Sequence, residues 1–183
     1  MTIYSVVVFL HLAGALALFI GYGIEWTASA LFRNAANTEE LRAWLRVFKV
    51  SPPLSGAGLG ILLVSGGYLA SLSGAMKQGW IPVAIVGIFV ALALGMGLIL
   101  PRMKAIRAAL PSGSEAISAA LRARLSDPVL LTAIRVRVLL ATGIVYVMAA
   151  KLPLSPSFLV LAIAVAVGLA FSLSTWNRRS PAR

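Results

Sequence analysis

The chain has 183 residues, of which 60% are hydrophobic and 11% charged, and its mean hydropathy is +0.96. Soluble domains contain about 45–50% apolar and about 25% charged residues, so this composition excludes an ordinary soluble protein. Cysteine is absent, which excludes disulfides, thiolate metal sites, iron–sulfur clusters and a cysteine nucleophile. The formal net charge of +11 is also typical of nucleic-acid-binding proteins. Whether it indicates nucleic acid here depends on where the Lys and Arg residues lie relative to the apolar segments.

Five apolar segments approach the ~20 residues that a helix needs to cross ~30 Å of hydrocarbon. In chain order they are residues 3–24, 52–72, 80–100, 128–150 and 156–176. The second, fourth and fifth segments are each preceded by a side chain that can cap a helix and start with proline at the first helical position. These pairs are Ser51-Pro52, Asp127-Pro128 and Ser155-Pro156. The sequence therefore predicts an all-α integral membrane protein with five transmembrane helices in a single domain, residues 1–183.

The first segment has a competing interpretation as a signal peptide, because Ala28-Ser29-Ala30 resembles an A-x-A cleavage site. No basic residue precedes the apolar run. The run is also longer than the ~7–15 residues of a typical signal-peptide core. We therefore interpret residues 3–24 as a membrane span.

The Lys and Arg residues are divided unequally between the two sides of these spans. Fourteen of the sixteen lie in the first and third connections, in the fourth span or in the C-terminal tail, whereas Lys77 and Lys151 lie on the other side. Because cytoplasmic segments carry the excess of Lys and Arg, we expect the N-terminus outside and the C-terminus in the cytoplasm of a bacterial inner membrane. Attraction to anionic lipids on the cytoplasmic side then accounts for the charge without nucleic acid.

Two cytoplasmic segments, 38–50 and 114–125, have helical periodicity. In the first, Thr38 can cap, and apolar residues follow the i, i+3, i+4, i+7 spacing at Leu41, Trp44, Leu45 and Phe48. The second is a weaker copy whose stripe consists of Ile117, Leu121 and Leu125. Each is expected either to lie in the headgroup layer or to dock on the bundle as a solvated helix.

The first span contains the chain's one histidine, His11, and places Glu25 on the same side of the helix. The two are fourteen residues apart, or ~21 Å at 1.5 Å per residue, so they cannot form one acid–base pair. Polar side chains in a bilayer normally face the protein interior. We therefore expect a buried His11 that is hydrogen-bonded to another helix, with Thr142 and Tyr146 of the fourth span as the best-placed partners. Ligation of haem or a metal is the alternative, because neutral imidazole is the commonest nitrogen ligand.

Glu25 is expected at the cytoplasmic boundary, a level to which Arg135 and Arg137 of the fourth span can snorkel. Their matched depth predicts an ion pair between Glu25 and one of these arginines. A structural role is the first interpretation and a proton relay the second. Gly56-x-x-x-Gly60, with Gly66 and Gly67 beyond it and Gly87, Gly95 and Gly97 in the third span, predicts close helix packing, with a dimer seam or the flat wall of a ligand cleft as the alternatives.

Three short motifs carry a resemblance to a known family: His11-Leu-Ala-Gly14, "SPPLSGAGLGILLVSGGYLA" in the second span and "YVMAAKLP" at the end of the fourth. Over roughly residues 5–153 the chain resembles a family of uncharacterised bacterial integral membrane proteins in the copper-resistance-D-like group. That group also contains the membrane-bound haem-dependent protoporphyrinogen oxidases. The resemblance implies a four-helix core bundle plus one C-terminal span, and it aligns His11 and Lys151 with a histidine and a lysine that recur in the group.

Three functions are compatible with these residues. The first is an accessory or structural membrane component without its own catalytic site, with a homodimer as an alternative assembly. The second, to which the resemblance adds support, is a b-type haem protein in redox or tetrapyrrole chemistry, with His11 as axial ligand and Tyr146 or Lys151 nearby. Small-solute or proton transport is the third, and it has less support because the sequence has no broken helix or paired acidic site. Copper transport is not expected from a chain with one histidine.

Overall fold

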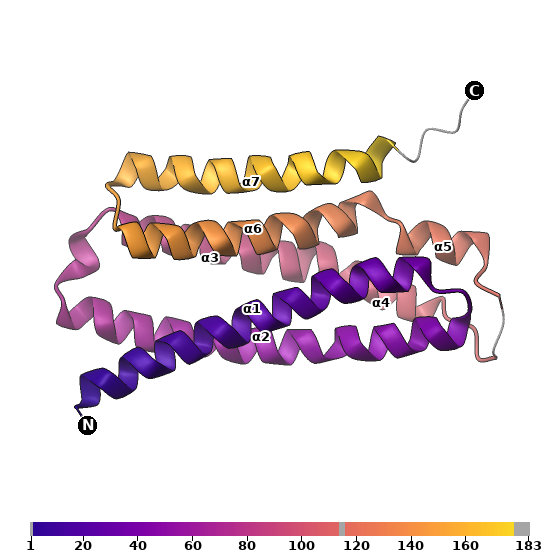
Figure 1. The fold of residues 1–183 in the computed structure, drawn as a ribbon, viewed down its shortest axis with the longest axis horizontal. Coiled ribbons are helices and arrows are strands. Elements are labelled where there is room, and N and C mark those ends of the chain that lie inside the picture. The colour runs from indigo at the N-terminus through magenta and orange to yellow at the C-terminus, as the bar shows by residue number, and fades with distance from the viewer. Residues whose placement is uncertain (1, 114–115, 178–183) are drawn as a thin grey trace.

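The computed structural model describes residues 2–113 and 116–177, and within these ranges the chain forms helices and no strand. Figure 1 shows the helices running nearly parallel to the long axis of the molecule. Their bounds are α1 Ile3–Asn34, α2 Thr38–Leu72, η1 Ala75–Lys77, α3 Trp80–Ala93, η2 Leu94–Ile99, α4 Leu100–Ala108, α5 Ala119–Leu125, α6 Pro128–Ala150 and α7 Leu154–Asn177. Five helical segments are long and apolar enough to cross a membrane, which confirms the prediction of an all-helical chain with five such segments.

The first two helices are longer than the sequence predicts. α1 has 32 residues and α2 has 35, or ~48 and ~52 Å at 1.5 Å per residue, whereas the hydrocarbon layer is ~30 Å thick. The amphipathic segment 38–50 is therefore the first part of α2 and is collinear with the predicted span 52–72. The prediction that α2 begins at Ser51-Pro52 is wrong.

Asn37, rather than Thr38, caps α2, because its side chain accepts a hydrogen bond from the backbone N–H of Glu40. Thr38 is buried and donates to the carbonyl of Gly113 instead. The helix continues through both Pro52 and Pro53. Proline inside a helix removes a backbone bond and crowds the preceding turn, but neighbouring helices that hold both sides of the interruption allow it in membrane proteins.

α3, η2 and α4 form one continuous helical rod that widens in the middle. In η2 the backbone makes a π-turn, in which the N–H of Leu100 donates to the carbonyl of Gly95, five residues earlier. The next residue is Pro101, which has no N–H and whose ring would meet the carbonyl of Gly97, four residues earlier, in a regular helix. A π-turn is a known way to accommodate such an interruption.

α6 lies at the centre and contacts α1, α3, η2 and α7. The predicted cap at its start is present, since Asp127 accepts from the backbone N–H of Val129 at 3.0 Å. α6 ends at Ala150, and the next residue, Lys151, has a φ of 49°, in the left-handed region. α7 already begins at Leu154, so the prediction that Ser155-Pro156 starts the last span is wrong by one turn or less.

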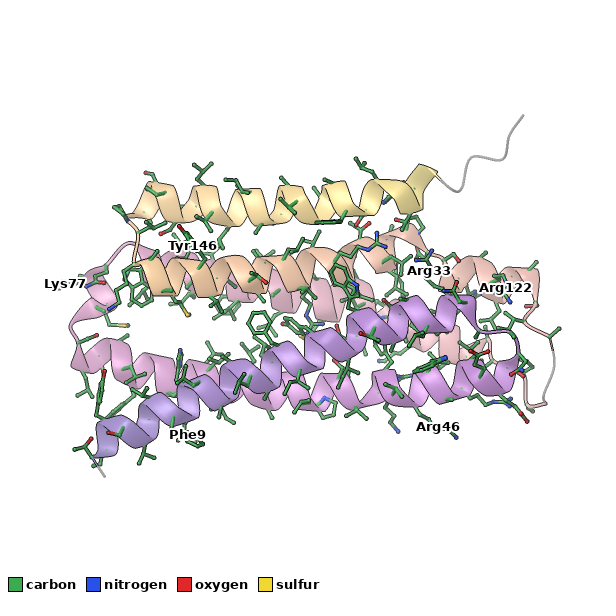
Figure 2. All side chains as sticks on the ribbon, viewed as in Figure 1. Phe9, Arg33, Arg46, Lys77, Arg122 and Tyr146 are labelled. Carbon is green, nitrogen blue, oxygen red and sulfur yellow. The ribbon has the colours of Figure 1, made fainter. Side chains whose placement is uncertain are left out.

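The two ends of the bundle differ in charge. Figure 2 shows Arg33, Arg46 and Arg122 toward one end, which we call the cationic end, and Lys77 at the other, which we call the lysine end. The arginines Arg178, Arg179 and Arg183 of the tail lie outside the described residues, as do residues 114 and 115 of the second amphipathic segment.

The larger hydrophobic core lies at the cationic end. Side chains from α1, α2, α4, α5 and α6 meet there, among them Phe32, Leu41, Phe48, Met103, Leu121, Leu125 and Ile134. Both amphipathic segments therefore turn their apolar stripes toward this core, which favours docking on the bundle over a position in the headgroup layer. A second core joins α3, α6 and α7, around Val83, Leu140, Val147 and Leu161.

Candidate functional site

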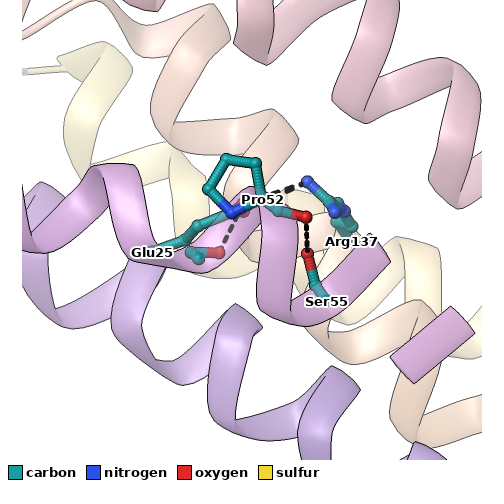
Figure 3. A network of polar contacts seen from close by, with 5 residues as sticks. Glu25, Pro52, Ser55 and Arg137 are labelled. Carbon is teal, nitrogen blue, oxygen red and sulfur yellow. Dashed lines mark hydrogen bonds and ion pairs between the residues drawn. The ribbon is translucent and has the colours of Figure 1, made fainter. Parts of the chain in front are cut away.

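Glu25 is the centre of a buried polar cluster in which three helices meet. Its side chain comes from α1 and is 2% exposed. Arg137 of α6 donates from Nη1 to Oε2 at 3.1 Å, and Ser51 of α2 donates from Oγ to Oε1 at 2.8 Å. Figure 3 shows Glu25 and Arg137 facing each other beside Pro52. We call Tyr22, Glu25, Ser51 and Arg137 the polar cluster.

The guanidinium group of Arg137 is held on more than one side. Its carbon atom lies 4.1 Å from the centroid of the Tyr22 ring, a distance at which a cation is attracted to an aromatic face. Gly95 of the π-turn is a second neighbour, because a Cβ there would lie 3.1 Å from Nη1. The Nε atom of Arg137 is buried and has no hydrogen-bond partner among the described residues.

The ion pair is inside the bundle rather than at its surface. Arg137 is nine residues after Pro128 and thirteen before Ala150, or ~14 and ~20 Å from the two ends of α6. The two predicted arginines take different partners. Arg137 turns inward to Glu25, while Arg135, on the other side of α6, donates to the carbonyl of Phe171 in α7 at 2.9 Å.

A buried ion pair of this kind constrains how the helices pack. Removing two charges from water is costly, and the cost is offset only where additional hydrogen bonds satisfy the charged atoms. The hydroxyl of Ser51 supplies one such bond, and both carboxylate oxygens of Glu25 have donors. Leaving either partner alone would bury an uncompensated charge, so the cluster fixes the mutual position of α1, α2 and α6.

His11 forms a separate contact toward the lysine end, and its partner is on α2. Nδ1 lies 3.0 Å from Oγ of Ser65. The Ser65 hydroxyl donates to the carbonyl of Ile61 at 2.5 Å, so its one proton is in use and Nδ1 must be the donor to Ser65. Nε2 of the neutral ring is consequently the acceptor nitrogen. Gly66 makes room for the ring, because a Cβ there would lie 2.9 Å from Cε1.

The structure does not bring Thr142 and Tyr146 to His11, so the prediction that they are its partners is wrong. Thr142 donates to the carbonyl of Val138 in its own helix, and both side chains are exposed, Tyr146 to 57%. Lys151 is also exposed, at the end of α6. The physical reason is that α1 pairs with α2, while it meets α6 at the polar cluster and in the core of the cationic end.

Close packing of α1 on α2 uses glycines next to those that the spacing predicts. A Cβ on Gly58 would lie 2.7 Å from the carbonyl oxygen of Gly14, and one on Gly21 would lie 2.8 Å from Cβ of Ser55. In contrast, no atom lies within 4 Å of a Cβ placed on Gly56, Gly60 or Gly67. The predicted packing role of Gly56-x-x-x-Gly60 within the chain is therefore wrong, because these two residues face away from α1.

Two apolar grooves run along the other side of the bundle, between α3, α6 and α7. Their volumes are about 300 and 480 Å³. Val90, Val165 and Leu169 line both, so they adjoin. Neither groove is lined by a member of the polar cluster or by His11, so neither connects these polar groups to a ligand space.

Sequence reasoning did not assign Tyr22, Ser51 or Gly95 to the surroundings of the ion pair, nor Ser65 to His11. Gly66, which directly follows Ser65, was the available signal for the histidine contact, and Pro101 was the available signal for an irregular helix after Gly95. In the described part of the chain, no three His, Cys, Asp or Glu residues come together as a metal site. The arrangement thus offers a paired charge and a neutral imidazole with one acceptor nitrogen. Comparison of the chain with protein families, curated proteins and solved structures finds no match.

Proposed function

We propose that the protein is an accessory or structural component of a bacterial inner membrane, of the copper-resistance-D-like kind, whose polar groups hold the helices together. The observation that supports this proposal best is the polar cluster. Glu25 and Arg137 form an ion pair, with Ser51 as an additional donor to the carboxylate, and neither residue lines either of the two grooves. Charged groups that bind a substrate or relay protons in a membrane normally face a cavity or pathway.

A double-mutant cycle on Glu25→Gln and Arg137→Gln tests the structural role. Each single variant leaves one buried group without its partner, and we expect each to lower the free energy of unfolding in mild detergent, by ~3–5 kcal/mol for loss of the arginine. The double variant should lose less than the sum of the two. Additive losses below ~0.5 kcal/mol each would contradict a structural cluster.

The proposed orientation places the cationic end in the cytoplasm, with the N-terminus outside, because Lys and Arg are enriched in cytoplasmic segments. The chain has no native cysteine, so single-cysteine labelling is unambiguous. In intact spheroplasts, a membrane-impermeant maleimide should label Lys77→Cys and leave Lys104→Cys unlabelled until the cells are opened. Labelling of Lys104→Cys from outside would reverse the orientation.

A b-type haem protein is the second candidate, and the geometry of His11 is the observation that favours it. Histidines that ligate metals commonly donate through the other ring nitrogen to a neighbouring acceptor, and Ser65 is such an acceptor for Nδ1. Tyr146 and Lys151, the candidates for a second contact, are exposed and make no hydrogen bond to His11. The hydrogen bonding of His11 therefore fits the role of an axial haem ligand. Tyr146 and Lys151 do not complete a haem site around it.

An absorption spectrum separates the two candidates. Protein purified from haem-replete cells should be colourless if the role is structural. A Soret band that is lost in His11→Ala and retained in Thr142→Ala would favour the haem protein. Ser65→Ala is an informative third variant, because it keeps the imidazole and removes the group that orients it.

A further inference from the structure

Two sets of described cations can be distinguished at the cationic end. One set is engaged within the protein: Arg122 donates to the carbonyls of Arg33 and Ala35, Arg124 to that of Ala105, and Arg42 to those of Pro111 and Gly113. Arg102 pairs with Asp127 at 2.9 Å. These side chains tie together the helix ends and the loop after α4, so their charge is explained by the fold.

The second set consists of four exposed cations that make no hydrogen bond or ion pair with any other described residue: Arg46, Lys49, Lys104 and Arg107. Arg46 and Lys49 are three residues apart on α2, and Lys104 and Arg107 are three apart on α4. Residues three apart in a helix share a face. The fold thus presents two matched pairs of free cations, on two different helices.

Both pairs lie close to the ends of apolar spans. Lys49 and Arg46 precede Pro52 by three and six residues, and Lys104 and Arg107 follow Leu100 by four and seven. Each pair is therefore within two helical turns of a span that the sequence predicts. Long cationic side chains at that distance can keep their stems along apolar surface and their charge in the headgroup layer.

The surface next to the cations of α2 is apolar rather than polar. Val47 and Val50 lie beside Arg46 and Lys49 and are 42% and 54% exposed. A soluble acidic partner would leave these valines in water or need a matching apolar patch. A membrane interface accepts both kinds of side chain at once, the cations at the phosphates and the valines toward the acyl chains.

We propose that Arg46 and Lys49 on α2, together with Lys104 and Arg107 on α4, bind the phosphate groups of anionic phospholipids in the leaflet at the cationic end. The proposal deepens the proposed function and rests on its membrane placement. It assigns the interaction with anionic lipid to four named side chains, and it excludes the engaged arginines from that role. Each cation near a membrane surface strengthens attraction to anionic lipid by about fivefold.

Native mass spectrometry of the full chain in mixed micelles with equal phosphatidylglycerol and phosphatidylcholine tests this. The wild-type protein should retain phosphatidylglycerol in preference to phosphatidylcholine. Arg46→Gln/Lys49→Gln and Lys104→Gln/Arg107→Gln should each reduce that preference at least ~fivefold. The matched control is Lys77→Gln/Lys151→Gln, which removes the same charge at the lysine end and should leave the preference unchanged.

Three outcomes would overturn the proposal. A control variant that loses as much preference as the test variants would show that net charge alone is responsible. Displacement of phosphatidylglycerol by millimolar inorganic phosphate would assign the sites to free phosphate. Equal retention of the two lipids by the wild type, with binding of a polyglutamate peptide or a DNA duplex, would assign the surface to a soluble partner.

The test is independent of the proposed orientation. If Lys104→Cys is labelled from outside and the lipid preference is intact, only the proposed orientation is contradicted. If Lys104→Cys is protected in spheroplasts and the wild-type protein shows no lipid preference, only the lipid sites are contradicted. Because both pairs are exposed, Gln at these positions is not expected to affect folding. If one of the two double variants nevertheless fails to fold, the other double variant still tests the proposal.

Discussion

Ser51 has the residue type and the following proline of a helix cap, yet its hydroxyl serves the carboxylate of Glu25. A hydrogen bond to a charged group contributes ~1.5–3 kcal/mol, so Ser51→Ala should lower the free energy of unfolding by about that amount. Ser71→Ala is the matched control, because Ser71 is exposed on the same helix and bonds only its own turn, at Tyr68. The control should change stability by less than ~0.5 kcal/mol, and equal losses in a denaturant series would contradict the role of Ser51.

Two glycines of the π-turn region give a sharper comparison. A Cβ on Gly95 would lie 3.1 Å from Nη1 of Arg137, whereas one on Gly97 would have no atom within 4 Å. Gly95→Ala should displace the guanidinium and lower the thermal midpoint. Gly97→Ala should leave the midpoint unchanged or raise it, because alanine is favoured over glycine in a helix by ~1 kcal/mol. Should both variants behave alike, the guanidinium is not packed against Gly95.

Depth along the helices predicted that Glu25 would pair with Arg135 or Arg137, and the structure contains the pair with Arg137. The choice between the two depends on rotation of α6, which places Arg135 against α7 instead. The partner of His11 was missed for a similar reason. A match in depth does not say which neighbouring helix a side chain faces, and α1 turns His11 toward Ser65 on α2.

In the helix pair α1 and α2, the face of the helix on which a glycine lies decides whether that glycine takes part in the contact. Gly58 and Gly60 are two residues apart in one helix, but only the first faces α1, where its Cβ would lie 2.7 Å from Gly14 and Leu18 backbone atoms. Gly58→Ala should therefore separate the two helices locally and lower the thermal midpoint by several degrees, while Gly60→Ala should not. Thermal unfolding in one detergent compares them directly, and a larger loss for Gly60→Ala would place the helix interface on the other face.

Helix existence was predictable from the apolar runs, and helix ends were less so. The rule that proline starts a helix succeeded at Pro128 and failed at Pro52, where α2 continues through the proline. Pro101 is a third case, since a π-turn precedes it and the rod continues. Tertiary contacts settle these alternatives, and a single sequence does not contain them.

At the scale of the whole molecule, α1 and α2 form one unit and α3, α6 and α7 another, with α1 joining them at the polar cluster and at the cationic end. The cationic end combines the larger core with the arginines that hold helix ends. Composition predicted a single bundle, and the positions of Lys and Arg predicted its charge on one side. Neither predicted that the two amphipathic segments would complete a core, because each segment's apolar stripe was equally compatible with a membrane surface.

This arrangement predicts that stability is concentrated at the cationic end, and two phenylalanines of α1 test it. Phe32 is fully buried, with its ring centroid 6.1 Å from that of Phe48, whereas Phe9 is 67% exposed toward the lysine end. Phe32→Ala should lower the free energy of unfolding by ~3–5 kcal/mol, as in other buried phenylalanine truncations.

Phe9→Ala removes the same atoms from the same helix, but Phe9 has few protein contacts to lose, so its cost should stay below ~0.5 kcal/mol. Both variants can be measured by denaturant unfolding in one detergent, with helix content as the readout. Similar losses at the two positions would mean that the bundle is held equally along its length. A loss confined to Phe32 would instead locate the stable core where α2, α4 and α5 close over the end of α1, because only there does the phenylalanine side chain have neighbours on every side.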